Sequence, residues 1–370
     1  MTTTVPLVDL RAAHAEVADE IRAGFDRILA DTAFIKGSEV EAFEQEYASY
    51  VGVSHCVGVA NGTDAIELAL RAAEVPAGSS VVIPANTFVA TASAVIRAGA
   101  RPVLADVDDQ TLLLDPAACA SAVRPDTSAI LPVHLYGQLA PMAAIGKVAA
   151  ERNLAVIEDA AQAHGATQDG QPVAAGAQLA SVSFYPGKNL GAYGDAGAVL
   201  TNAADLARRV RLLGDHGSER RYEHLTLGFN SRLDALQAVV LRAKLRRLAA
   251  WNLARAQAAA RYAELLADLD EVVLPRVAPG NTHVWHLYVI RVPRRDQVLA
   301  SLHEDGIHAA IHYPVPVHLH PAFRDLGYAP GDFPVAEQAA GQILSLPLYP
   351  QITPGQQEAV AVALRKAITA

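Results

Sequence analysis

Residues 154–159 read Leu-Ala-Val-Ile-Glu-Asp, a short apolar run that ends in two carboxylates. Similar apolar runs occur at 80–84, 101–106 and 129–133, and segments with helical character separate them. Short buried strands that alternate with helices are typical of a parallel sheet covered on both faces. The sequence therefore predicts an α/β fold. The intervening helices are expected at 88–98, 115–123 and 142–152.

Lys188 follows in the stretch Ser183–Gly191, which reads Ser-Phe-Tyr-Pro-Gly-Lys-Asn-Leu-Gly. A strand is expected near 180–184, so Asp159 and Lys188 are both predicted near ends of strands in one sheet, where functional groups of such folds lie. A lone lysine in a loop is ordinarily a solvated surface residue. A desolvated lysine, in contrast, can condense with an aldehyde. The lysine alone does not decide between these interpretations.

Asp159 and Lys188 together form the pair that an enzyme holding pyridoxal 5'-phosphate needs. The lysine forms an imine with the aldehyde, and a carboxylate keeps the pyridine nitrogen protonated so that the ring withdraws electrons. The run Asn61-Gly-Thr-Asp64 predicts a helix N-terminus, where free amides bind a phosphate. A well-capped helix without a ligand is the alternative. Candidates for the phosphate and for stacking on the ring are Gly62, Thr63, Ser183 and Phe88.

The composition changes in the C-terminal third of the chain. A long amphipathic helix is expected over 234–269, and residues 283–292 beyond it alternate like a strand. We therefore predict two domains: a large α/β domain over 1–250, with helices at its N-terminus, and a smaller α+β domain over 251–370.

Composition and charge exclude several classes of function. The chain has 370 residues and a formal net charge of -9, which gives no electrostatic case for a nucleic-acid partner. It has no apolar run long enough to cross a bilayer, and its N-terminus lacks the basic and apolar regions of a signal peptide. We expect a soluble cytoplasmic protein with no membrane partner.

Four histidines gather in a proline-rich stretch near residue 315, but no carboxylate cluster accompanies them, so no metal site is expected. They are His308, His312, His318 and His320.

Five segments of the chain resemble the DegT/DnrJ/EryC1/StrS family of sugar aminotransferases. The resemblance covers nearly the whole chain and implies fold-type I of the pyridoxal phosphate enzymes, with a mostly parallel central sheet. It also implies a homodimer with shared active sites. Some relatives are dehydratases with a histidine at the position of Lys188, so the lysine favours transamination. The segments are 61–64, 83–88, 158–165, 183–191 and 228–234.

The resemblance also implies roles for individual residues. Lys188 would hold the cofactor and carry the proton, Asp159 would pair with the pyridinium, and Gln162 would hydrogen-bond the phenolic oxygen. For His164 a supporting role and a direct role stay open. The remaining cofactor ligands would be Phe88 on the ring and Ser183, Gly62 and Thr63 on the phosphate, with Asn230 reaching the phosphate from the neighbouring subunit.

A narrower resemblance, in residues 133–137, 184–188 and 311–319, is to enzymes that aminate carbon 3 of a dTDP-linked 3-keto-6-deoxyhexose. The expected amino donor is glutamate, with glutamine as the alternative. Amination at carbon 4 or of a keto-inositol, a cofactor-binding regulator, and a lyase or desulfurase are the alternatives. Two adjacent arginines also suit a diphosphate. By this similarity Tyr185, His312 and Tyr313 would surround the sugar, and Arg220, Arg221 and Tyr222 of the partner chain would meet the diphosphate.

Overall fold

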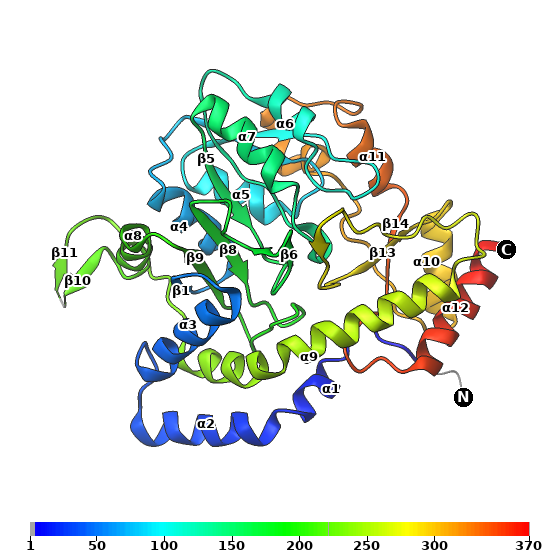
Figure 1. Cartoon of the computed structure of the whole chain (residues 1–370), viewed down its shortest axis with the longest axis horizontal. Coiled ribbons are helices and arrows are strands. Elements are labelled where there is room, and N and C mark those ends of the chain that lie inside the picture. The colour runs from blue at the N-terminus through cyan, green and yellow to red at the C-terminus, as the bar shows by residue number, and fades with distance from the viewer. Residues whose placement is uncertain (1–3, 221, 370) are drawn as a thin grey trace.

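The computed structural model describes residues 4–220 and 222–369, and its centre is a seven-stranded sheet in the order β1-β9-β8-β5-β4-β2-β3 (Figure 1). β9 runs antiparallel to both of its neighbours, and the other neighbouring pairs are parallel. The predicted α/β fold with a mostly parallel sheet is therefore confirmed. The strands are β1 (His55–Val59), β2 (Ser80–Pro84), β3 (Arg101–Ala105), β4 (Thr127–Ile130), β5 (Ala155–Asp159), β8 (Leu179–Ser183) and β9 (Gly197–Thr201).

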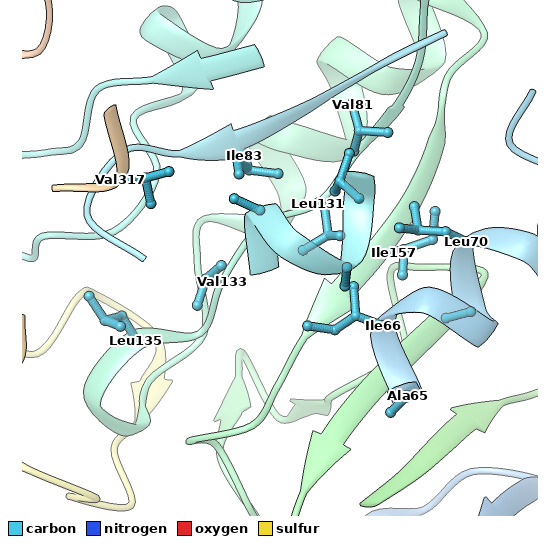
Figure 2. Packing of buried hydrophobic residues seen from close by; sticks show 14 of the residues in the cluster. Ala65, Ile66, Leu70, Val81, Ile83, Leu131, Val133, Leu135, Ile157 and Val317 are labelled. Atoms are coloured by element: carbon cyan, nitrogen blue, oxygen red, sulfur yellow. The ribbon is translucent and has the colours of Figure 1, made fainter. Parts of the chain in front are cut away.

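Alternate residues of the strands pack on opposite faces of the sheet. Val81 and Ile83 of β2 belong to the core under one layer of helices, whereas Val82 belongs to the core on the other face. Figure 2 shows Leu70 of the first layer beside Ile157 of β5. Each such fully buried aliphatic side chain stabilises the fold by about 1.5–3 kcal/mol. The first layer holds α4 (Gly62–Ala72), α5 (Val89–Arg97) and α8 (Ala204–Gly214); the second holds α3 (Ser38–Val51), α6 (Pro116–Ala122), α7 (Met142–Arg152) and α9 (Ala235–Leu265).

The long helix α9 leads from the sheet to a separate C-terminal core. Its first half packs against α2 (Ala18–Asp31) and α3, and its second half packs against α12 (Pro354–Thr369). The C-terminal core also contains α10 (Arg295–Glu304) and the antiparallel pair β13 (Tyr288–Arg291) and β14 (Ile343–Leu346). The predicted domain boundary at residue 250 falls inside α9.

The strand expected over 283–292 is shorter in the structure, where β13 begins at Tyr288. Trp285 has a positive φ of 51° and its N–H donates to Nδ1 of His283 at 2.9 Å, so this stretch turns before it can pair. Because of this turn, His286 lies before β13 and does not pair with β14.

A small hairpin projects beyond α8, away from the central sheet (Figure 1). The hairpin strands are β10 (Ser218–Arg220) and β11 (Glu223–His224), and the remaining short elements are α1 (Leu10–Ala15), η1 (Leu135–Gly137), β6 (Thr167–Gln168), β7 (Gln171–Pro172), β12 (Asn281–Thr282), η2 (Val317–Leu319), η3 (Pro321–Leu326) and α11 (Pro334–Ala340).

No helix of the described residues has the length and apolar character needed to span a membrane.

Candidate active site

Lys188 lies in the turn that joins β8 to β9. Its backbone N–H donates to the carbonyl of Tyr185 at 2.8 Å, and Nζ of Lys244 on α9 donates to the carbonyl of Gly191 at 2.6 Å. The Lys188 side chain is half-buried, and desolvation lowers the pKa of its ammonium to about 8, although the carboxylate of Asp159 opposes this shift. At pH 7 roughly a tenth of the amine is therefore neutral. An amine with this pKa is able to act as a nucleophile near neutral pH.

Asp159 ends strand β5 and is only 5% exposed. Its Oδ2 accepts a hydrogen bond from Oγ1 of Thr91 at 2.8 Å, and its Oδ1 accepts from the backbone N–H of Ala161 at 3.2 Å. Oγ1 of Thr87 lies 2.8 Å from Oγ1 of Thr91, so two hydroxyls in series support the carboxylate. The arrangement orients a buried negative charge close enough to act on Lys188.

The N-terminus of α4 approaches the end of β8 closely. Asn61 caps the helix, since its Oδ1 accepts from the N–H of Asp64 at 2.8 Å. A Cβ added to Gly62 would lie 2.5 Å from Cβ of Ser183, so no side chain fits at this position. Gly62, Thr63 and Ser183 therefore lie together at one helix end, where backbone amides and a hydroxyl suit a phosphate.

Gln162 links the sheet edge to the C-terminal part of the chain. Its Oε1 accepts from the backbone N–H of Tyr136 at 2.6 Å, and its Nε2 donates to the hydroxyl of Tyr313 at 3.2 Å. The ring of Tyr313 lies 5.0 Å from the ring of Phe88, which is 49% exposed. The structure thus brings Phe88, Gln162 and Tyr313 into one group, and the exposed ring of Phe88 is available for stacking.

His312 and Tyr185 belong to the same region. Nδ1 of His312 lies 2.8 Å from Oγ of Ser345, and burial, together with the charge of Lys188, lowers the pKa of the imidazole to about 4. His312 is therefore neutral at physiological pH. The ring of Tyr185 is exposed, on the outer side of the turn that carries Lys188.

His164 makes hydrogen bonds to protein groups through both ring nitrogens. Nε2 lies 2.9 Å from the carbonyl of Ser183, and Nδ1 lies 2.7 Å from the hydroxyl of Tyr47. Because a carbonyl can only accept, the imidazole proton is on Nε2 and Nδ1 accepts from the tyrosine. Burial lowers the pKa of His164 to about 3. These contacts favour the supporting role among the two that the sequence left open.

The residues expected to act on a second copy lie apart from this group. Arg220 and Tyr222 belong to the projecting hairpin segment, where the ring of Tyr222 is 81% exposed (Figure 1). Asn230 follows the hairpin and is exposed, and its backbone forms an isolated antiparallel β-bridge with Asp215. Arg221 lies outside the described residues.

The histidine-rich stretch uses its side chains in local contacts. Nε2 of His318 lies 3.0 Å from Oε1 of Glu337, and Nε2 of His320 lies 3.1 Å from the carbonyl of Val315. Within residues 4–220 and 222–369, no three His, Cys, Asp or Glu side chains gather as metal ligands.

Four residues of the site were not singled out from the sequence. The hydroxyl of Thr91 and the amide of Tyr136 hold Asp159 and Gln162. Asn189 and His286 make a polar contact next to Lys188. The position of Asn189 directly after Lys188 is a sequence feature that points to a role in the site. For Thr91 the only such feature is its spacing of one helical turn from Thr87, which is a weak indication.

The model of the DegT/DnrJ/EryC1/StrS aminotransferase family matches residues 15–365. The dTDP-3-amino-3,4,6-trideoxy-alpha-D-glucose transaminase of Streptomyces venezuelae is 44% identical over 365 residues, which cover 99% of this chain and 96% of that protein. The UDP-N-acetyl-3-dehydro-alpha-D-glucosamine 3-aminotransferase of Acidithiobacillus ferrooxidans is 46% identical over 366 residues, which cover 99% and 98%.

Solved structures of aminotransferases superpose on the whole chain. DesV from S. venezuelae matches with a TM-score of 0.97 at 44% identity, covering 99% of this chain and 98% of that chain. NtdA from Bacillus subtilis, with bound cofactor PMP, matches with a TM-score of 0.93 at 33% identity, covering 100% and 86%. The predicted fold type and the resemblance stated from the sequence are confirmed.

Proposed function

Because the chain belongs to the DegT/DnrJ/EryC1/StrS aminotransferase family, we propose that it moves an amino group from L-glutamate to the 3-keto carbon of a dTDP-linked 3-keto-6-deoxyhexose. The product would be a dTDP-3-amino-3,6-dideoxyhexose. Full-length similarity to transaminases of dTDP-amino sugars supports this sugar class. The observation that carries the chemistry is the lowered pKa of Lys188 beside the buried carboxylate of Asp159.

The cofactor is pyridoxal 5'-phosphate, which supplies an electron-withdrawing ring next to the reacting carbon. The close approach of Gly62 to Ser183 fits its phosphate, since a Cβ at residue 62 would fill this corner. Lys188 would hold the aldehyde and Asp159 the ring nitrogen. The remaining contacts are assigned to Thr63 and Ser183 at the phosphate, Phe88 on the ring, Gln162 at the phenolic oxygen and Asn230 of a second copy.

Lys188 has a second task once the amine of the donor has replaced it. Its Nζ would take the proton from the α-carbon of glutamate in the first half-reaction and would add a proton to carbon 3 of the sugar in the second, with the amino group and the hydrogen held on the bound cofactor in between. A pKa of about 8 suits this exchange, because a group that both accepts and donates a proton works best near the ambient pH. Asp159, held by Thr91 and Ala161, keeps its charge fixed while the proton moves.

The site is proposed to be completed by a second copy of the chain. The hairpin projects from its own subunit, and the segment that follows β11 exposes two leucines, Leu225 and Leu227, the latter 93% exposed. Exposed apolar side chains at the base of a projecting hairpin suit burial against a partner. In the homodimer Arg220, Arg221 and Tyr222 of one copy would meet the diphosphate bound at the Lys188 turn of the other.

The sugar would lie between the Lys188 turn and the segment that contains the 312–313 peptide. Tyr185 is exposed on the turn of Lys188, and the rings of His312 and Tyr313 lie 5.6 Å apart on the other segment. The neutral imidazole of His312 can hydrogen-bond a hydroxyl without adding charge. The three side chains are therefore proposed as sugar contacts.

Incubation of the purified enzyme with glutamate and a dTDP-3-keto-6-deoxyhexose tests the proposal. NMR of the product is expected to show the new amine on carbon 3, with one 2-oxoglutarate formed per amino sugar. Parallel arms contain the 4-keto isomer and a keto-inositol. An amine that forms only in one of those arms would overturn the substrate assignment.

The 46% identity to a UDP-sugar 3-aminotransferase favours one second candidate, a UDP-linked 3-keto-N-acetylhexosamine. A further arm with this substrate separates the two by kcat/KM. Two relatives are named as a sensory transduction protein and a pleiotropic regulatory protein, with 46% and 45% identity. Formation of 2-oxoglutarate from glutamate in this assay would exclude a regulatory protein that binds the cofactor without turnover.

A further inference from the structure

Lys188 has a histidine on either side that the proposed chemistry does not use. His164 follows β5, and His286 precedes β13. The pKa of each imidazole is lowered first by burial and then by, among other charges, the ammonium of Lys188, which places both rings near the lysine. If either ring took up a proton beside Lys188, it would compete for the proton that the lysine has to move.

Asn189, the residue after Lys188, connects the turn to both histidines. Its Nδ2 donates to the carbonyl of Val284 at 2.8 Å and to Oδ1 of Asn252 at 2.9 Å. A carbonyl can only accept, so the amide nitrogen of Asn189 must face Val284 and its Oδ1 must face the other way. Asn252 on α9 in turn donates from Nδ2 to the carbonyl of His164 at 2.8 Å.

This orientation determines the tautomer of His286. Nδ1 of His286 lies 3.2 Å from Oδ1 of Asn189, which can only accept, so the imidazole proton is on Nδ1. Nε2 is then the unprotonated nitrogen. His164 is held in the opposite neutral tautomer, since the carbonyl of Ser183 accepts from its Nε2–H.

The ionisable groups near His286 lie on several elements, and each disfavours protonation of His286 when it carries a positive charge. They are Lys188 on the turn, Arg255 on α9, and the rings of His312 and His164 when protonated. Arg255 also donates from Nη1 to the carbonyl of Trp285, the residue before His286, at 3.3 Å. Asn189 contributes an uncharged acceptor where a carboxylate would stabilise an imidazolium.

We propose that Asn189 is a positioning residue of the amine-transfer site, which fixes the turn of Lys188 between α9 and residues 284–286 and holds His286 as the neutral Nδ1–H tautomer. The proposal rests on the proposed function. Its consequence is that, within each half-reaction, a proton taken up by Nζ of Lys188 stays there until the lysine returns it, because neither neighbouring histidine accepts it at physiological pH.

The first test measures the wild-type enzyme by NMR with ¹⁵N-labelled histidine, and His286→Gln assigns the resonance. His286 is expected to show a protonated Nδ1 and an unprotonated Nε2, with no titration between pH 5.5 and 8.5, a window that spans the ordinary histidine value of about 6.5. A resonance that titrates within this window, or the opposite tautomer, would overturn the proposal. This readout is independent of turnover and therefore stands even if the proposed substrate is wrong.

The second test compares Asn189→Asp with Asn202→Asp, a control in which an exposed residue gains the same charge and keeps its accepted bonds from Ser54. In Asn189→Asp the new carboxylate pairs with His286, so this histidine should titrate near neutral pH and kcat should fall on the acidic side of the profile. Asn202→Asp should leave both unchanged.

Asn189→Ala removes the support without adding charge. Loss of the fixed geometry is expected to lower kcat about tenfold, with an altered pH profile. A lower Tm with an unchanged kcat and pH profile would reduce Asn189 to a purely structural residue and contradict the proposal.

Discussion

The turn of Lys188 and the β10–β11 hairpin differ in how the chain supports them. The turn is bonded through Tyr185, Lys244 and Asn189, and α9 supports it from behind. The hairpin projects beyond α8, and Tyr222 within it and Leu227 after it are 81% and 93% exposed. The turn is packed inside the chain, whereas the hairpin presents side chains to solvent.

This difference separates the proposed site into two halves. The half that would hold the cofactor is built by the carboxyl ends of β5 and β8 and by the N-terminus of α4, so its geometry, apart from the proposed contact of Asn230 from a second copy, is fixed within one subunit. The half that would hold the diphosphate depends on assembly with a second copy. Substitutions in the first half should change chemistry, and substitutions in the hairpin should change substrate binding.

The largest effect is expected for Lys188→Ala. Loss of both the nucleophile and the proton carrier should reduce kcat by at least about 10³-fold. The absorbance of the bound cofactor should also change, whereas Lys147→Ala on the exposed side of α7 should behave as wild type. Near-normal turnover in Lys188→Ala would show that the turn is not the catalytic half.

A smaller effect is expected for Arg220→Ala on the hairpin. Removal of one charge-assisted contact to a diphosphate should raise the KM for the nucleotide sugar about tenfold, with the KM for glutamate unchanged. Arg365→Ala on α12, which removes an exposed arginine paired with Asp268, serves as the control. Equal changes in both KM values would contradict the division of the site into two halves.

The smallest effect is the pH dependence of cofactor capture, which tests only the half of the site that contains Lys188. Burial favours the neutral amine and lowers its pKa from 10.5 to about 8. The rate at which cofactor-free enzyme captures pyridoxal phosphate should therefore rise with pH up to about 8 and level off above it. A rate that continues to rise to pH 10, in stopped-flow absorbance, would indicate an ordinary solvated lysine.

The placement of Asp159, Lys188 and Gly62 could be predicted from the sequence because its signals are local. Apolar runs that alternate with helical segments indicate parallel strands. The carboxyl ends of such strands lie at one edge of the sheet, which brings Asp159 and Lys188 to the same edge. Asn61 and Gly62 indicate a helix end for a similar reason. These expectations depend only on periodicity and capping.

The support behind the lysine could not be predicted in the same way. Asn252 lies in the middle of a helix and His286 in an expected strand, and neither carries a pattern that relates it to residue 189. Their contacts arise from the course of α9 along the sheet and from the positive φ of Trp285, which delays the start of the strand to Tyr288. Tertiary packing, not local sequence, places them.

The most direct test of the two-copy site mixes two defective variants. Lys188→Ala and an Arg220→Ala/Tyr222→Ala double variant are unfolded together, refolded and assayed at low nucleotide-sugar concentration. If the halves come from different copies, half of the dimers are mixed and each has one intact site, so activity should recover to about a quarter of wild type. Activity that stays at the average of the two separately refolded variants would contradict a site shared between two copies.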